Sequence, residues 1–131
     1  MLLLQIIRCV FIRKIWNIAI NTHYVVVRKD LPLGFQAAQI VHAAGESVTV
    51  EVPPGTNAVV LETKNESELL AVMARLQRAG VPHVPIREVD APYANQLTAV
   101  GITPLKDRSL VKKILGKLKL LSGREETPAL K

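Results

Sequence analysis

The first clear pattern is an apolar, β-branched run at residues 24–27, typical of a strand buried on both faces of a sheet. Pro32 and Gly34 interrupt the run and predict a short loop. Small apolar residues then recur through 37–44 and predict a helix that packs closely on a sheet, with Gly45 closing its C-terminus. Strand–loop–helix junctions of this kind are where α/β proteins commonly bind ligands.

Three further segments have the composition of strands. They are residues 58–61, 84–88 and 97–102, each rich in apolar side chains. Residues 47–56 alternate valine with threonine and glutamate before a Pro-Pro-Gly turn. Both a brief edge strand and an ordered loop fit this segment, and we expect mostly loop.

A second helix is predicted to begin after Asn65, which can cap it, while Glu68 at its third position can bond back to the cap. Gly80 and Pro82 are expected to end this helix. Its apolar positions recur at helical spacing and predict a buried stripe of Leu69, Leu70, Met73 and Leu76.

A last helix is predicted to start at Thr103 and Pro104, a favourable cap and first-turn pair. Gly116 is a weak point in it, and its buried stripe is predicted to contain Leu110, Val111, Ile114, Leu115 and Leu118. The order of elements, β-α-β-α-β-β-α, predicts a layered α/β domain with a small, mostly parallel sheet.

The chain of 131 residues is long enough for one domain with a single core. We expect the domain to span residues 22–121, followed by a flexible tail at 122–131. Residues 1–21 differ in composition and are expected to form an N-terminal extension outside the fold, with charges that interrupt the apolar run too soon for a membrane span. A loose or misassigned upstream extension, a surface-lying amphipathic segment and an organelle presequence all remain open for it.

The net charge indicates the kind of partner to expect, and the cysteine content excludes some kinds of site. The 17 Lys and Arg residues exceed the 11 Asp and Glu residues and give a formal charge of +6, which favours an anionic partner such as RNA or a membrane surface. The single cysteine, Cys9, excludes an internal disulfide framework and a cysteine-rich zinc site, and it fits a reducing compartment. We expect no metal.

Several motifs together resemble the archaeal and eukaryotic class of peptidyl-tRNA hydrolases. They are Val-Val-Arg-Lys-Asp-Leu at 26–31, Ala-Ala-Gln-Ile-Val-His-Ala-Ala at 37–44, Arg-Ala-Gly at 78–80, Thr-Ala-Val-Gly-Ile-Thr-Pro at 98–104 and Leu-Lys-Leu at 118–120. The resemblance implies a three-layer α/β/α domain with a small, mixed, four-stranded sheet whose last strand is antiparallel. It also implies metal-free hydrolysis of the ester that joins a peptide to tRNA, without a cofactor, in the cytoplasm, and it weakly suggests a homodimer.

The resemblance also shows departures. Relatives typically carry two lysines in the loop before the first helix, where this chain has Leu33 and Phe35. The acidic residue at the end of the third strand corresponds to Glu88, and the loop after it is shorter, so that a family Arg-Thr pair is missing and Asp90 could substitute. Thr98 matches a family threonine proposed to act at the site.

Ester hydrolysis needs a group that orients and deprotonates water and donors that stabilise an oxyanion. We expect Glu88 or Asp90 to orient water and His42 to assist proton transfer or bind substrate. Thr98, Gln39 and backbone N–H groups near Gly34 would supply polar contacts. Lys29 is a candidate for the missing positive charge, and Gln36 for a further substrate contact.

Structural roles compete with each of these assignments. His42 could be a packed or surface histidine, Gln39 could tie its helix to a loop, and Thr98 could simply favour a strand. Glu88 and Asp90 could be solvated loop carboxylates. His23 and His83 are expected to be structural, whereas the basic last helix, with Lys112 and Lys113, is either a solvated face or a contact for the tRNA backbone.

Two functions from different classes therefore stay open, a peptidyl-tRNA hydrolase and a non-catalytic RNA- or protein-binding module of the same fold. The environment of Phe35 discriminates between them, because an exposed Phe beside the cleft favours a protein contact while a Phe buried under the loop leaves room for substrate. A membrane-associated protein that uses residues 1–21 is a third, weaker alternative.

Overall fold

The computed structural model describes residues 21–123. The predicted extension at 1–21 and tail at 122–131 therefore lie almost entirely outside the described residues. In chain order the elements are β1 (Thr22–Arg28), α2 (Leu33–Glu46), β2 (Asn57–Thr63), α3 (Glu66–Arg78), β3 (His83–Arg87), β4 (Leu97–Leu105), α4 (Ser109–Leu115) and β5 (Lys119–Leu120).

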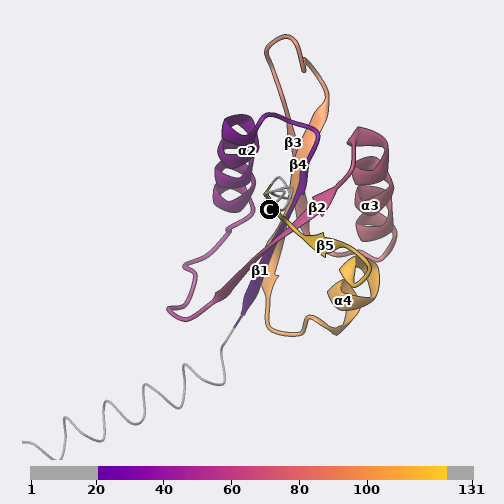
Figure 1. Cartoon of the computed structure of the whole chain (residues 1–131). Helices are drawn as coiled ribbons and strands as arrows, with labels where there is room; N and C mark the ends of the chain where they lie inside the picture. The colour runs from indigo at the N-terminus through magenta and orange to yellow at the C-terminus, as the bar shows by residue number, and fades with distance from the viewer. Residues whose placement is uncertain (1–20, 124–131) are drawn as a thin grey trace, which may run out of the picture.

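The elements form three layers, with α2 on one face of the sheet and α3 and α4 on the other (Figure 1). The strand order is β3-β4-β1-β2-β5. Only β1 and β2 pair in parallel, while β4 runs antiparallel to β1 and β3, and β5 antiparallel to β2. The predicted α/β/α architecture and antiparallel β4 are confirmed.

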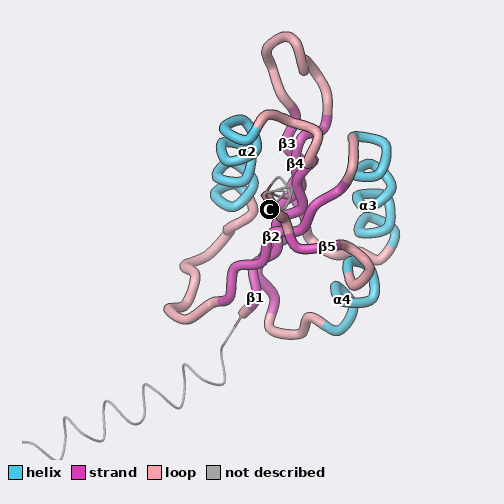
Figure 2. The backbone as a smooth tube through the Cα atoms, in the orientation of Figure 1, coloured by secondary structure: helices cyan, strands magenta, loops and turns pink. Residues whose placement is uncertain are grey.

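The details of the sheet differ from the predictions in two ways. The sheet has five strands instead of four, because the segment after α4 returns to pair with β2 through Lys119 and Leu120. The prediction of a mostly parallel sheet was wrong, because residues 88–96 join β3 directly to β4 without a crossover helix. Figure 2 shows this loop projecting beyond the edge of the sheet.

Successive side chains of β1 point into two hydrophobic cores, one on each face of the sheet. Val26 is fully buried and packs in the core beneath α3 and α4, whereas Val25 and Val27 face the core that contains Ala43 of α2. Burial on both faces explains why this strand reads as a continuous apolar run. In α3, Leu69 and Leu76 are buried as predicted.

Two buried stripes contain errors at single positions. In α3, Val72 was not part of the predicted stripe but is buried together with Leu69 and Leu76, while Leu70 is 37% exposed. In α4, Val111 and Leu115 are buried, but Leu110 is exposed. The buried residues follow helical spacing, i, i+3 and i+7 in α3 and i, i+4 in α4, and this spacing places Leu70 and Leu110 beside the buried face, not within it.

The predicted start of α3 is confirmed. The Asn65 side chain accepts a hydrogen bond from the Glu68 N–H at 3.0 Å. The Glu68 carboxylate accepts from the Lys64 N–H, one residue before the expected partner. Gly80 follows the helix with φ of 69°, a conformation that glycine adopts without strain.

Two helix boundaries were predicted wrongly. Helix α2 continues through Gly45 to Glu46, because the Ser47 hydroxyl and N–H both donate to the Ala43 carbonyl and carry the last turn further. Thr103 and Pro104 lie inside β4, which stays paired with β1 as far as Leu105. Helix α4 begins only at Ser109.

The C-terminal half of α2 lies very close to β4. A Cβ added at Gly101 would clash with the Ala43 carbonyl oxygen and the Ser47 side chain. The sequence therefore needs glycine at this position to let the helix approach the strand.

The helices carry no membrane-crossing candidate: none within residues 21–123 combines the length and apolar character that a bilayer requires.

We predict that Gly101→Ala lowers the free energy of unfolding by about 1–3 kcal/mol, because helix and strand must separate to fit a methyl group. The matched change Gly45→Ala, in open space inside α2, should instead stabilise the fold by about 0.5–1 kcal/mol. Urea unfolding of both variants measures the difference, and equal stabilities would contradict this account of the helix–strand contact.

Candidate active site

One edge of the sheet gathers the functional candidates. The C-terminal ends of β1, β2 and β3 meet the start of β4 there, together with the loop that enters α2 and the loop at 88–96 (Figure 1). Ligand sites of α/β sheets occur at such an edge because loops and helix starts converge on it.

A buried arginine fixes the two loops at this edge. The Arg28 guanidinium, in a residue only 5% exposed, donates to both carboxylate oxygens of Asp30 at 3.0 and 2.9 Å. It also donates to the Gln96 side chain at 2.9 Å and to the Leu97 carbonyl at 3.1 Å. Asp30 begins the loop into α2 and Gln96 ends the loop before β4, so one side chain sets the position of both.

The start of α3 is tied to the same point. A carboxylate oxygen of Glu66 accepts the Leu97 N–H at 2.6 Å and lies 4.0 Å from the Arg28 guanidinium. Neither Arg28 nor Glu66 was given a role from the sequence. A charged residue at the end of an apolar strand was the signal available for Arg28, because an arginine there must find partners when it is buried.

Three side chains form a polar chain beside this network. The Thr98 hydroxyl lies 2.6 Å from Gln39 Oε1 and 3.1 Å from the Ile86 carbonyl, and Gln39 Nε2 donates to Glu88 Oε2 at 3.3 Å. The orientation of the Gln39 amide is determined by Glu88, because its oxygen would otherwise face a carboxylate. Thr98 and Gln39 are both buried.

Glu88 is held in place by its own loop. Its Oε1 accepts the Val89 N–H at 2.9 Å and the Asp90 N–H at 3.1 Å. These backbone hydrogen bonds, from Asp90 first and then from Val89, lower the pKa of Glu88, and the Gln39 amide and the charge of His42 lower it further. Glu88 is therefore a fixed anion at neutral pH.

The structure thus brings together four of the predicted residues, Gln39, His42, Glu88 and Thr98. His42 is exposed on α2, three positions after Gln39, and its charge acts on the Glu88 carboxylate, whereas Thr98 is buried and bonds to Gln39. Asp90 is exposed, and its backbone, not its side chain, contacts Glu88. We refer to Gln39, His42, Glu88 and Thr98 as the acidic cluster, after its one carboxylate, that of Glu88.

The remaining loop candidates lie on the other flank of α2. Gln36 is buried, and its side-chain amide donates to the carbonyls of Lys29 and Leu31, which ties the loop to the helix. The Lys29 ammonium lies 3.6 Å from the Glu62 carboxylate. Lys29 and Gln36 line a pocket of about 660 Å³ whose lining contains neither His42 nor Glu88.

The two residues at the family lysine positions have different environments. Leu33 is 73% exposed and lines the pocket beside Gln36. Phe35 is half-buried, and its ring packs on Tyr93 of the 88–96 loop with a centroid distance of 5.2 Å. Phe35 is thus partly covered by the loop, which is intermediate between the exposed and the buried environment that would discriminate the two functions.

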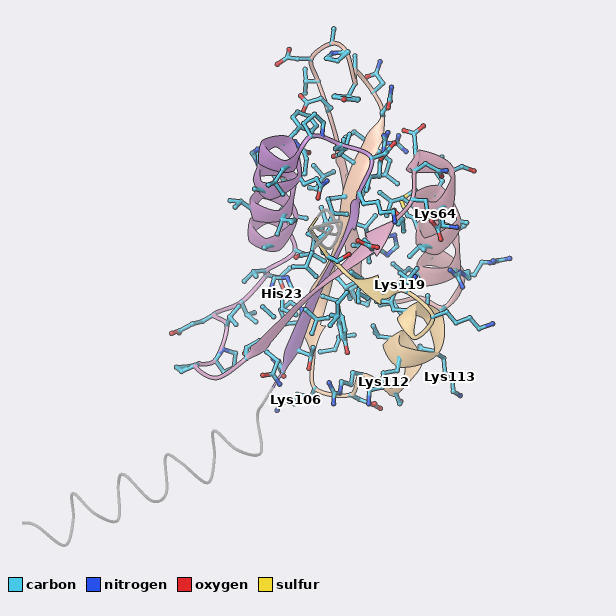
Figure 3. The ribbon with its side chains drawn as sticks, viewed as in Figure 1. His23, Lys64, Lys106, Lys112, Lys113 and Lys119 are labelled. Carbon is cyan, nitrogen blue, oxygen red and sulfur yellow. The ribbon has the colours of Figure 1, made fainter. Side chains whose placement is uncertain are left out.

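Other candidates lie away from the cluster. Lys112 and Lys113 are exposed on α4, on the opposite face of the sheet from α2 (Figure 3). His23 bonds to the Ser47 hydroxyl at 2.7 Å, and burial lowers its pKa. His83 bonds to the Val81 carbonyl at 2.7 Å. Both histidines make the structural contacts expected of them.

Within the part of the chain that the structure describes, no three His, Cys, Asp or Glu side chains are grouped so that they could hold a metal ion.

Comparisons with known proteins show the family to which the chain belongs. The family model described as "Peptidyl-tRNA hydrolase PTH2" matches residues 21–121. A protein named "Peptidyl-tRNA hydrolase" from Methanococcus maripaludis is 32% identical over 112 residues, which cover 74% of this chain and 96% of the relative. A protein of the same name from Thermococcus onnurineus is 34% identical over 113 residues, covering 73% and 93%.

A structural comparison adds one solved protein. It is a protein of unknown function from Agrobacterium tumefaciens, with 16% sequence identity and a TM-score of 0.49, and the match covers 78% of this chain and 98% of that one. The resemblance found in the sequence is confirmed by the family model and the archaeal relatives.

We predict that Glu88 stabilises the fold in a pH-dependent way. Because its pKa is lowered in the folded state, its stabilisation is present at neutral pH and is lost as the pH falls through that lowered pKa. The difference in unfolding free energy between wild type and Glu88→Gln should therefore shrink on acidification. Urea unfolding at neutral and acidic pH measures it, and a difference that does not change with pH would contradict the prediction.

Proposed function

Because the chain belongs to the peptidyl-tRNA hydrolase PTH2 family, we propose that it hydrolyses the peptide–tRNA ester at the flank of α2 that carries the acidic cluster. Hydrolysis of this ester is the reaction for which the family is named, and tRNA is the nucleic-acid part of the substrate. The observation that carries the placement is a carboxylate, Glu88, fixed by three hydrogen-bond donors beside the exposed imidazole of His42.

The lowered pKa of Glu88 decides its role. A carboxylate that is stabilised as an anion is a poor proton acceptor but a good group for orienting water through its free lone pairs. Two backbone N–H groups occupy Oε1, whereas Oε2 accepts only the Gln39 amide among the described contacts. We assign water binding to Oε2 and proton acceptance to a ring nitrogen of His42.

Glu88 and His42 together account for the water and the proton that the reaction uses. The water oxygen attacks the ester carbonyl while His42 takes its proton, and the bond to the ribose oxygen then breaks as that oxygen receives the proton. The oxyanion that forms in between needs nearby donors. The first N–H groups of α2, from Leu33 to Phe35, have no side-chain cap and carry the positive end of the helix dipole.

The other predicted site residues take supporting roles in this proposal. The Asp90 backbone positions Glu88, and the Gln36 amide holds the loop that starts α2. Lys29, Lys112 and Lys113 stay candidates for contact with the tRNA backbone, Lys29 from the pocket and the two α4 lysines from the opposite face.

Two wider properties belong to the same proposal. We place the protein in the cytoplasm, because peptidyl-tRNA is a product of translation and the family acts on it. A homodimer stays a prediction from the family resemblance, and sedimentation of the purified protein measures it.

We predict that purified protein cleaves an N-blocked aminoacyl-tRNA, and that Glu88→Gln and His42→Ala each lower the single-turnover rate by about 10²–10⁴-fold, as expected when a water-orienting or proton-accepting group is removed. The matched control is Glu46→Gln, an exposed carboxylate one turn beyond His42 on α2, which should keep the wild-type rate. Ester cleavage is followed by release of labelled blocked amino acid.

The same assay separates the two function classes. A wild-type protein that binds tRNA without cleaving the ester would support the non-catalytic module and contradict the proposal. Unchanged rates in both Glu88→Gln and His42→Ala would keep the activity but remove the acidic cluster as its site.

We predict that Thr98 acts by positioning Gln39, since its hydroxyl is buried and engaged by protein oxygens. Thr98→Val should lower kcat by roughly 10- to 100-fold with little change in KM, because Gln39 loses the donor that fixes its amide. Thr98→Ser keeps the hydroxyl and should restore most of kcat. A Ser variant as slow as the Val variant would show that the methyl packing matters instead.

A further inference from the structure

A groove of lysines crosses the end of β2 and joins the two faces of the sheet. The 660 Å³ pocket at the start of α2 and a second pocket of about 210 Å³ share Lys29, Glu62 and Lys119 in their linings, so the two hollows adjoin at the end of β2. The second pocket extends to Lys64 at the start of α3 and to Lys117 after α4. In Figure 3, Lys64 is labelled beside α3 and Lys119 at β5. We call Lys29, Lys64, Lys117 and Lys119 the lysine groove.

The acidic residues of the groove do not balance its lysines. Glu62 is buried, pairs with Lys29 and accepts the Ser122 N–H. Glu68 is occupied by the backbone N–H of Lys64. Lys64, Lys117 and Lys119 are exposed, and within residues 21–123 none of them forms an ion pair.

An extended polyanion fits this arrangement better than a compact ligand. Lysine ammonium groups attract phosphates as point charges on flexible stems. They lack the planar fork with which arginine binds two oxygens of one group, so they suit a row of phosphates better than a single precisely oriented ligand. No aromatic side chain lines either pocket, so bases have no surface on which to stack there. The two adjoining hollows are lined by α2 on one side of β2 and by α3 and the segment after α4 on the other, so their lysines are spread out as a chain of successive phosphates requires.

The groove also leads toward the proposed chemistry. Its 660 Å³ end reaches Leu33, the first residue of α2, whose N–H groups have no side-chain cap. The acidic cluster lies on the opposite flank of the same helix, about two turns further along it. A phosphate chain in the groove would therefore lead to the start of α2, whose other flank carries the acidic cluster at which the ester is placed.

We propose that Lys64, Lys117 and Lys119 bind the phosphodiester backbone of the acceptor end of tRNA along this groove. The inference rests on the proposed function, since it takes peptidyl-tRNA as substrate. It assigns tRNA contact to the β5 edge, in addition to the candidates on α4, and it separates backbone binding from the chemistry on the other flank of α2.

The test uses the triple variant Lys64→Gln/Lys117→Gln/Lys119→Gln in the full chain. Binding of uncharged tRNA is measured by fluorescence anisotropy across a series of salt concentrations. Removal of each lysine that binds a phosphate should reduce the slope of log K against log salt by about 0.7–0.9, and the Kd at low salt should rise roughly tenfold or more. The KM for N-blocked aminoacyl-tRNA should rise in parallel, with kcat little changed.

A matched control removes the same charge elsewhere. Arg75→Gln/Arg78→Gln/Lys106→Gln neutralises three exposed cations, two at the far end of α3 and one after β4, and should keep the wild-type slope and KM. Thermal unfolding of both triple variants checks that they fold. Equal reductions in affinity and slope in the two triple variants would show an effect of net charge alone and would overturn the proposal that the lysine groove binds tRNA.

A substrate without a phosphate backbone separates the two proposals. An N-blocked aminoacyl ester of adenosine should be cleaved by the groove variant and the wild type at the same rate. If the wild type cleaves neither substrate, the proposed function fails, while the salt slopes still decide the groove. If the wild type cleaves tRNA ester and the groove variant shows an unchanged slope and KM, the groove is overturned.

Discussion

The buried guanidinium of Arg28 is the contact on which the functional edge depends. Burying a cation costs several kcal/mol unless it is paired and hydrogen-bonded, and Asp30, Gln96 and the Leu97 carbonyl accept from four of the five N–H groups of the guanidinium. Those partners come from the two loops that must be placed, the entry to α2 and the end of the 88–96 loop. The hydrogen bonds to Asp30 raise the pKa of Arg28, so the cation persists wherever the protein folds.

The positions of the acidic-cluster residues depend on the hydrogen bonds of Arg28. The loop that Arg28 and Glu66 hold at Gln96 and Leu97 also closes on itself, because the Glu88 N–H donates to the Gln96 carbonyl and the Asn95 N–H donates to the Glu88 carbonyl. Glu88 therefore cannot move independently of this loop. Helix α2, entered through the Asp30 end, brings Gln39 and His42 to the same side. A carboxylate held this firmly needs no reorganisation when a substrate arrives, which is the condition for electrostatic catalysis.

Local patterns predicted the strands and the cap of α3 because their signals lie within a few residues. The β-branched run marked β1, and Asn65 with Glu68 marked the start of α3. The extension of β4 through Pro104 and the short β5 escaped prediction because pairing with β1 and β2 sets them. The residues of the cluster were named from sequence, but their contact, such as Thr98 with Gln39 across 59 positions, is a property of the fold.

The absence of two lysines at Leu33 and Phe35 has a physical consequence for how substrate charge is met. Phe35 packs on Tyr93 and so places an aromatic pair, in place of a cation, between the start of α2 and the 88–96 loop. Positive charge is concentrated across the helix instead, at Lys29 and Lys119. Under the proposed function α2 then separates two tasks: the lysine groove on one flank would bind the tRNA backbone, while the other flank carries the fixed carboxylate of Glu88. Such a division explains how the loop lysines can be absent without requiring the acidic cluster to change.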